Sequence, residues 1–185
     1  MLVAFLVIGA SVVHAQQVAC GDRSLPEEQR WNPRTVSPAL SHFYSLQRSL
    51  SKTFAAGRYA RAESVALEYL EAAKLFPCNW NYGNAIHDAN LVLGMGALKR
   101  GRQDDAVRHL REAGRSPGSP QLDSFGPAVM LANSLAKDGG FAEVAAYFRD
   151  VKRFWKMDDG RLDKWIAELE AGRVPDFGIQ LRRPI

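Results

Sequence analysis

The chain has 185 residues, of which 46% are apolar and 24% are charged, and its formal net charge is +4. This composition is typical of an ordinary globular protein of one domain and excludes an intrinsically disordered chain. The small net charge, with basic and acidic residues interleaved along the sequence, does not favour nucleic-acid binding.

The first segment, residues 1–15, reads MLVAFLVIGASVVHA and contains no charged residue. Its apolar run is shorter than the roughly 20 residues that cross a bilayer as a helix, and it ends in a small-x-small pattern. We therefore expect an export signal peptide, a periplasmic or secreted protein, and no membrane span in the mature chain. Because no Lys or Arg precedes the apolar run, an uncleaved anchor is the alternative.

Residues 16–37 contain two prolines, are followed by Pro38, and show little periodicity, which predicts an irregular arm. This arm carries Cys20, and the second cysteine of the chain is Cys78. An even number of cysteines in an exported chain favours a disulfide between Cys20 and Cys78, worth about 4 kcal/mol for a loop of this length. Free buried thiols and lipidation of Cys20 are the alternatives.

The body of the chain, residues 38–172, has apolar residues at spacings of three and four, which is typical of amphipathic helices. Residues 173–185 follow as a C-terminal tail. We expect two helices before Pro77, a third that is apolar on more than one side, and a final helix whose free amides Asp158 and Asp159 can cap. The helices are expected at 38–56, 62–76, 84–100, 105–113, 128–137, 141–155 and 160–171.

Three turns between these helices share one pattern, with a glycine at Gly57, Gly101 and Gly139. The residue five positions after each glycine, inside the next helix, is small or β-branched. Small residues such as Gly94 stand where two helices must approach closely. The pattern resembles the tetratricopeptide repeat, a helical hairpin that stacks into a solenoid. The resemblance implies an all-α fold of three antiparallel helical hairpins with a C-terminal helix.

The segment 116–127, SPGSPQLDSFGP, separates the second and third hairpins. Its prolines and glycines predict a non-helical loop, which Leu122 and Phe125 would pin to the core. It resembles a segment of poorly characterised, exported bacterial proteins of tetratricopeptide-like type, as does VPDFG near the C-terminus. That resemblance implies no activity.

The tetratricopeptide resemblance also implies a groove lined by the first helix of each hairpin, in which a protein or peptide partner binds. Gln47 and Ser51 stand where the repeat's clamp for a C-terminal carboxylate needs Lys and Asn, so that specific activity is not expected. The predicted partner-binding residues are Tyr44, Gln47, Arg48, Ser51, Tyr82, His87, Asp88, Leu91, Met95 and Asn133.

The stretch 79–90, NWNYGNAIHDAN, is the strongest candidate for chemistry. Its Asn81 or Asn84 could cap the third helix, and Asp88 would favour the positive end of the helix dipole. The alternatives are partner binding and an envelope hydrolase that uses His87 and Asp88. Because the chain offers too few further ligands for a metal and no phosphate loop or nucleophile motif, we expect no metal, no cofactor and no enzyme activity.

Overall fold

The computed structural model describes residues 36–185, and residues 1–35 lie outside the described part. Within the described residues the protein is all-α, as expected, with eight α-helices, one short 3₁₀-helix and no β-strand. The helices are α1 (Pro38–Ala55), α2 (Tyr59–Ala73), α3 (Tyr82–Lys99), α4 (Gln103–Gly114), α5 (Pro120–Phe125), α6 (Met130–Lys137), α7 (Phe141–Val151), α8 (Arg161–Glu170) and η1 (Gly178–Arg182).

Helix α1 forms because local capping and apolar spacing agree. The Ser37 hydroxyl accepts a hydrogen bond from the Leu40 backbone N–H at 3.1 Å, and Pro38 occupies the first turn, where its missing N–H leaves no bond unmade. Its buried side chains follow the predicted spacing of three and four residues. They are Leu40, Phe43, Leu46, Leu50 and Thr53.

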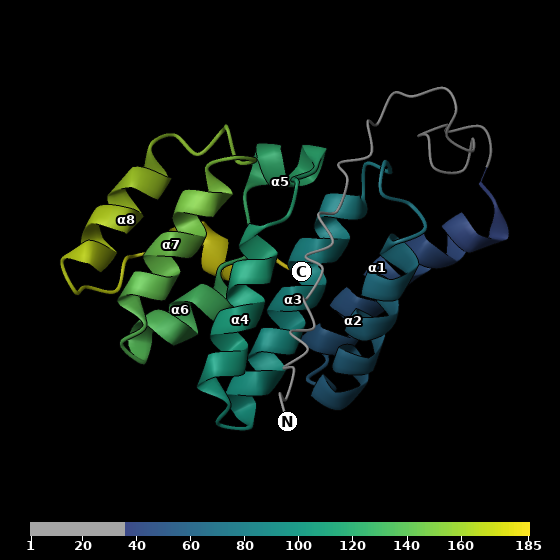
Figure 1. Cartoon of the computed structure of the whole chain (residues 1–185), viewed down its shortest axis with the longest axis horizontal. Helices are drawn as coiled ribbons and strands as arrows, with labels where there is room; N and C mark the ends of the chain where they lie inside the picture. Colours follow the sequence, from purple (N-terminus) through teal and green to yellow (C-terminus); the bar gives the residue numbers. More distant parts are fainter. Residues whose placement is uncertain (1–35) are drawn as a thin grey trace, which may run out of the picture.

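Helices that are neighbours in the chain pack in pairs: α1 lies against α2, α3 against α4, and α6 against α7. In Figure 1 they stand side by side from α1 and α2 at one end to α8 at the other. Helix α3 also packs against α2, so it joins the first two pairs.

The turns between paired helices share one backbone motif. Gly57, Gly101 and Gly139 have φ values of 70°, 70° and 87°, a region that L-residues with a side chain rarely adopt. The residue after each glycine donates its N–H to a carbonyl five positions earlier, the pattern of a Schellman cap. These bonds are Arg58 to Thr53 at 3.0 Å, Arg102 to Ala97 at 3.0 Å, and Gly140 to Leu135 at 2.9 Å. The predicted turns are therefore confirmed.

Two hydrophobic clusters form the core, and α3 belongs to both. The smaller cluster joins α1, α2 and one side of α3, including Ala85 and Val92. The larger cluster joins the other side of α3, including Leu91 and Ala97, to the helices that follow. A helix that is buried all round must be apolar on more than one side, as the sequence of α3 predicts.

Close approach between helices depends on Gly94, as expected from its place in the sequence. A Cβ atom at Gly94 would lie 2.3 Å from the Leu131 side chain on α6 and 3.2 Å from the His109 Cβ on α4. Since real Cβ contacts are longer than this, only glycine lets the three helices meet at this point.

Three expectations about the later part of the chain are wrong. Residues 120–125 form the short helix α5, because Pro120 occupies its first turn and the Ser119 hydroxyl accepts from the Leu122 N–H at 3.0 Å. Leu122 is buried as predicted, but the Phe125 side chain is 66% exposed. Helix α7 ends at Val151 rather than Trp155, and residues 152–154 continue as turns.

Helix α8 begins as predicted, with the Asp158 carboxylate accepting from the Leu162 N–H at 3.1 Å. Beyond it, residues 173–185 form a tail segment that contains η1. In Figure 1, η1 lies behind α6 and α7, and the described chain ends beside α3. The buried Phe177 ring lies 5.6 Å from that of Phe148 and 5.1 Å from that of Trp165. Ile185 packs against both hydrophobic clusters.

Candidate functional site

Four of the predicted partner-binding residues lie on one face of α1, and we call them the α1 row: Tyr44, Gln47, Arg48 and Ser51. Arg48 is exposed and the other three are half-buried. The Tyr44 ring stacks on that of Trp80 with 5.8 Å between centroids, and its hydroxyl accepts from the Asn79 side-chain amide at 2.9 Å. The side chains of Gln47, Arg48 and Ser51 make no hydrogen bond or ion pair with another described residue.

The His87–Asp88 pair lies at the buried start of α3. His87 is completely buried, its Nδ1 lies 2.8 Å from an Asp88 carboxylate oxygen, and its Nε2 lies 3.1 Å from the Tyr147 hydroxyl of α7. Burial, and secondarily the charge of Asp88, raise the pKa of Tyr147. Tyr147 therefore keeps its proton, and His87 bridges its hydroxyl and the Asp88 carboxylate. This chain joins α3 to α7.

The asparagines of the opening stretch bond to each other and to distant helices rather than capping α3. No side-chain cap bond forms at Asn81, so the expected capping is wrong. Asn81 instead donates to the Tyr69 hydroxyl of α2 at 2.7 Å and accepts from Asn84 at 2.8 Å. Burial, and secondarily the charge of Asp88, raise the pKa of Tyr69, so this phenol also stays protonated.

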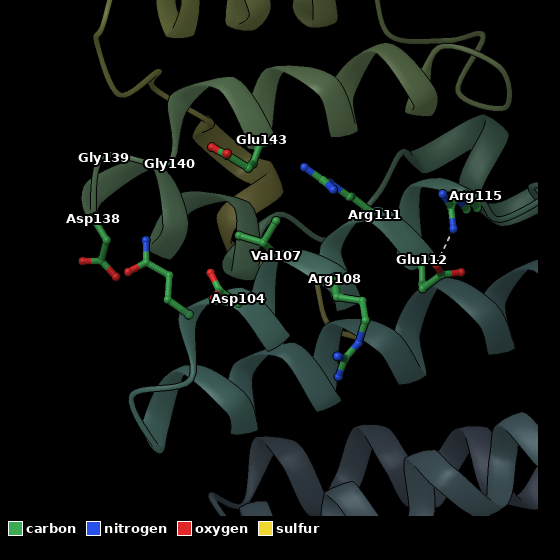
Figure 2. A pocket seen from close by; sticks show the side chains of 11 residues that line it. Asp104, Val107, Arg108, Arg111, Glu112, Arg115, Asp138, Gly139, Gly140 and Glu143 are labelled. Atoms are coloured by element: carbon green, nitrogen blue, oxygen red, sulfur yellow. Dashed lines mark hydrogen bonds and ion pairs between the residues drawn. The ribbon is translucent and has the colours of Figure 1, made fainter. Parts of the chain in front are cut away.

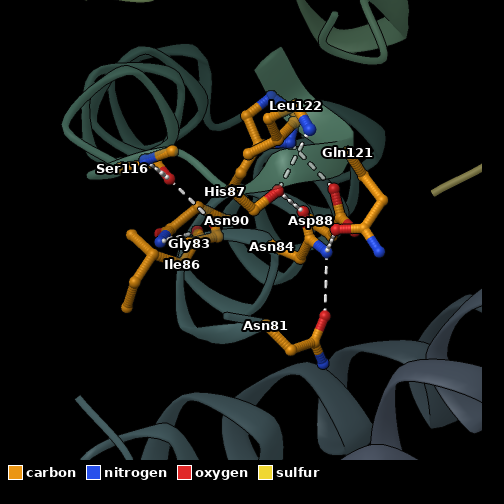
Figure 3. Close-up of polar contacts among 12 residues, drawn as sticks. Asn81, Gly83, Asn84, Ile86, His87, Asp88, Asn90, Ser116, Gln121 and Leu122 are labelled. Carbon is orange, nitrogen blue, oxygen red and sulfur yellow. Dashed lines mark hydrogen bonds and ion pairs between the residues drawn. The ribbon is translucent and has the colours of Figure 1, made fainter. Parts of the chain in front are cut away.

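Asn84 extends the same network towards the segment 116–121, which includes the start of α5, and Figure 3 shows Asn84 between Asn81 and Gln121. Its amide N–H lies 3.1 Å from the Gln121 side-chain oxygen, and its own oxygen accepts from the Ser119 hydroxyl at 2.5 Å. The Ser116 hydroxyl donates to the Gly83 carbonyl at 2.8 Å. Buried polar groups that satisfy one another in this way fix the position of the segment on α3.

Four further predicted residues differ in their surroundings. Leu91 is fully buried in the larger cluster, and Met95 is half-buried against it. Leu91 therefore offers no surface to a partner, contrary to the expectation of an open groove centre, because α3 is enclosed by its neighbours on this side. Tyr82 is half-buried against the smaller cluster, and Asn133 is half-buried on α6.

The tail segment lies over the part of α3 that the groove prediction placed at the surface. Arg183 interacts electrostatically with Asp88 and Tyr147, and burial lowers the pKa of its guanidinium. The Gln180 side-chain amide donates to the Phe125 carbonyl at 2.9 Å, which attaches η1 to the end of α5. The structure thus brings Asp88 and His87 together with the tail segment, and separates them from the α1 row.

Two surface depressions are lined by residues that the sequence did not single out. One, of about 530 Å³, lies between α4 and the turn before α7, where Figure 2 shows Arg108, Arg111 and Arg115 with Asp104, Asp138 and Glu143. Its charges are mixed and exposed, which is typical of a solvated surface. The other, of about 610 Å³, lies among the ends of α5 and α8 and the tail segment. The tail has little helical periodicity, so no sequence signal placed it beside α5.

Several predictions remain open. Cys20 and the signal peptide lie outside the described residues, so the pairing of Cys20 with Cys78 and the export of the chain stay predictions. Among residues 36–185, no helix has the length and apolar character that a membrane span requires. In the same part of the chain, no three His, Cys, Asp or Glu side chains group around a position for a metal ion.

Comparison of the chain with protein-family models, with curated proteins and with solved structures finds no match in any of the three. The candidate site therefore stands on its own geometry. That geometry consists of the α1 row, in which three of the four side chains have no partner among residues 36–185, a buried polar network at the start of α3, and an arginine-rich depression beside the tail segment.

Proposed function

We propose that the protein is an exported, non-enzymatic scaffold, built as a short tetratricopeptide-like array, which binds a protein or peptide partner along the α1 row. The observation that carries the proposal is the unused hydrogen-bonding capacity of Gln47, Arg48 and Ser51. These residues and Tyr44 are spaced so that they share one helix face. A partner that lies along α1 could contact all four.

The chemistry of the α1 row suits a polypeptide. Gln47 offers both a donor and an acceptor to a peptide backbone, Arg48 adds a positive charge, and Ser51 adds a hydroxyl. The Tyr44–Trp80 stack at one end of the row supplies flat aromatic surface next to these polar groups. Aromatic residues and arginine are the residue types most often found where partner binding is strongest.

The buried state of His87 weighs against the hydrolase alternative. Both of its ring nitrogens are engaged by neighbouring side chains, and none of its surface meets solvent. A general base must reach the proton that it abstracts. His87 and Asp88 fit a structural link between α3 and α7, which leaves partner binding as the function that we favour.

Site-specific cross-linking tests the α1 row. A photo-reactive amino acid is placed at Arg48, and in a control at Leu67 on α2, whose side chain is 56% exposed. Each protein is irradiated in envelope extract of its host. We expect one cross-linked partner from position 48 that is missing from position 67. The same species from both positions, or none from position 48, would contradict the proposal.

Affinity for that partner gives the second measurement. Reversing the charge in Arg48→Glu together with Ser51→Tyr should weaken binding of the purified partner at least about tenfold, since both changes remove complementary contacts. The exposed control Leu67→Ser should bind as the unchanged protein does. Circular dichroism of all variants verifies that they remain folded.

A further inference from the structure

The depression beside the tail segment combines exposed apolar side chains with arginines. It is an open hollow of about 610 Å³ lined from α5 by Phe125, from α8 by Arg161, and from the tail segment by residues including Ile179, Arg182 and Arg183. A hollow of this volume lies within the range of small ligand sites. It involves none of the α1 row.

Its apolar surface is unusually open to solvent. Phe125 is 66% exposed and Ile179 is 75% exposed. The hydrogen bond from Gln180 to the Phe125 carbonyl fixes the end of α5 against η1 and so keeps the two side chains at one hollow. Covering them would remove apolar surface from water, which stabilises a complex.

Positive charge surrounds this apolar surface. The described residues that line the hollow include three arginines and no Asp or Glu. The Arg183 guanidinium lies 5.7 Å from the centre of the Phe125 ring, and that of Arg161 lies 4.9 Å from the Trp155 ring. Stacking on aromatic rings holds these planar groups in defined orientations.

The arginines differ in how far they are already satisfied. Arg161 pairs with exposed Asp159 at 2.9 Å, and Arg183 interacts with Asp88. Arg182 is exposed and makes no ion pair with another described residue. Arg183 also keeps one buried nitrogen, Nη1, without a hydrogen-bond partner. The exposed Arg182 is therefore the arginine most open to a carboxylate from a partner.

We propose that this hollow is a second docking site, which takes an acidic peptide segment in which carboxylate and apolar side chains alternate. In an extended segment, neighbouring side chains point to opposite sides, so one side can cover the apolar residues while the other faces the arginines that line the same hollow. The apolar side chain covers Phe125 and Ile179, while a neighbouring carboxylate pairs with the exposed Arg182. The site does not depend on binding at the α1 row.

Fluorescence anisotropy tests the proposal on the purified mature chain. The probe is a fluorescein-labelled peptide of alternating Glu and Leu. Two comparison peptides replace every Glu by Gln or every Leu by Ser. We expect saturable binding of the Glu–Leu peptide and at least about fivefold weaker binding of both comparison peptides, since each lacks one of the two complementary features.

Variants of the exposed residues locate the site. Arg182→Gln and Ile179→Ser should each weaken binding of the Glu–Leu peptide about fivefold. Arg173→Gln, an exposed arginine of the same segment that does not line the hollow, is the control matched in charge and should bind normally. These side chains make few contacts, so the fold is expected to persist.

Each contrary outcome has a definite meaning. Unsaturable binding, equal affinity for a comparison peptide, or unchanged affinity of both hollow variants would overturn the proposal. A further experiment replaces the peptides by phosphatidylglycerol vesicles. If the protein bound these vesicles through Arg182 and did not bind the Glu–Leu peptide, the proposal would be overturned and the surface would be assigned to a membrane.

Discussion

His109 lies at the contact between α4 and α3, where its Nδ1 is 2.9 Å from the side-chain oxygen of Asn90. The Asn90 amide donates to the Ile86 carbonyl, so its oxygen faces His109 and accepts the Nδ1 hydrogen. Burial lowers the pKa of His109 first, and the charge of Arg108 lowers it further, while nearby acidic residues oppose both. His109 is thus held neutral in the folded protein.

This lowered pKa makes stability depend on pH in a definite direction. The unfolded chain binds a proton at His109 near the ordinary value of about 6.5, and the folded protein binds it only at lower pH. Between those two values the unfolded state holds more protons, so the free energy of unfolding falls as the pH falls. His109→Asn keeps the donor to Asn90 but cannot titrate, and should flatten this dependence.

Urea denaturation at a series of pH values from about 7.5 to 5 measures the effect. His42→Asn serves as the control, because the His42 side chain on α1 is exposed and pairs with Glu68 of α2. If His109→Asn retained the full loss of stability between pH 7 and 5, the lowered pKa would not be its source.

Helix α3 shows how one glycine positions a whole segment. A Cβ at Gly83 would lie 1.7 Å from the Gly118 carbonyl oxygen and 2.4 Å from its carbon, both backbone atoms. Since backbone cannot move aside as a flexible side chain can, Gly83→Ala should lower the free energy of unfolding by about 3 kcal/mol or more. The same change should disturb the bond from Ser116 to the Gly83 carbonyl.

Gly96, also inside α3, provides the matched control for denaturation experiments. A Cβ there would lie 1.8 Å from the end of the Glu63 side chain, which can rotate away. Alanine also favours a helix over glycine by up to about 1 kcal/mol, so Gly96→Ala should be nearly neutral. Similar losses at both positions would show that helix geometry, rather than the contact with Gly118, sets the cost.

The helical elements were predictable where spacing and turn chemistry agree. Gly57, Gly101 and Gly139 mark the turns, and the apolar spacing of α1 predicts its buried face. Helix α5 was not predicted, because the prolines of segment 116–127 were interpreted as helix breakers. Pro120, in the first turn after the Ser119 cap, instead favours a helix.

The candidate site was less predictable for a different reason. Helical spacing places the α1 row on one face, but it cannot say which neighbours cover a face of α3. Leu91 has a residue type and position that suit a groove, and His87 has one that suits catalysis. Both are buried because partners distant in sequence, such as Tyr147 and the tail segment, pack over α3. Such contacts leave no periodic signal.

At the scale of the whole molecule, the tail segment ties the helix pairs together. Phe177 packs on Phe148 of α7 and Trp165 of α8, and Ile185 contacts both hydrophobic clusters. Without such a connection, paired helices that touch only their neighbours can unfold one pair at a time. The tail segment adds contacts between parts of the chain that are far apart, and so favours a single cooperative transition.

Removing the Phe177 side chain tests this role. The ring is 1% exposed, so Phe177→Ala should lower the free energy of unfolding by about 3 kcal/mol. Ile179→Ala, in the same segment but 75% exposed, should change it by less than about 0.5 kcal/mol. Amide hydrogen exchange should quicken in η1 and around Asp88 in the first variant alone; unchanged exchange at Asp88 would argue against coupling between tail and α3.

The double contact of Ile185 also limits how this architecture can change in length. Proteins made of paired helices grow by duplication of a pair, because each new pair needs only a neighbour to pack on. A pair inserted between α4 and α6 would divide the larger cluster, and a tail of unchanged length could not pack on α7 and α8 and also contact the smaller cluster. The length of the tail segment therefore limits the number of helix pairs: a protein with more pairs would need a longer tail.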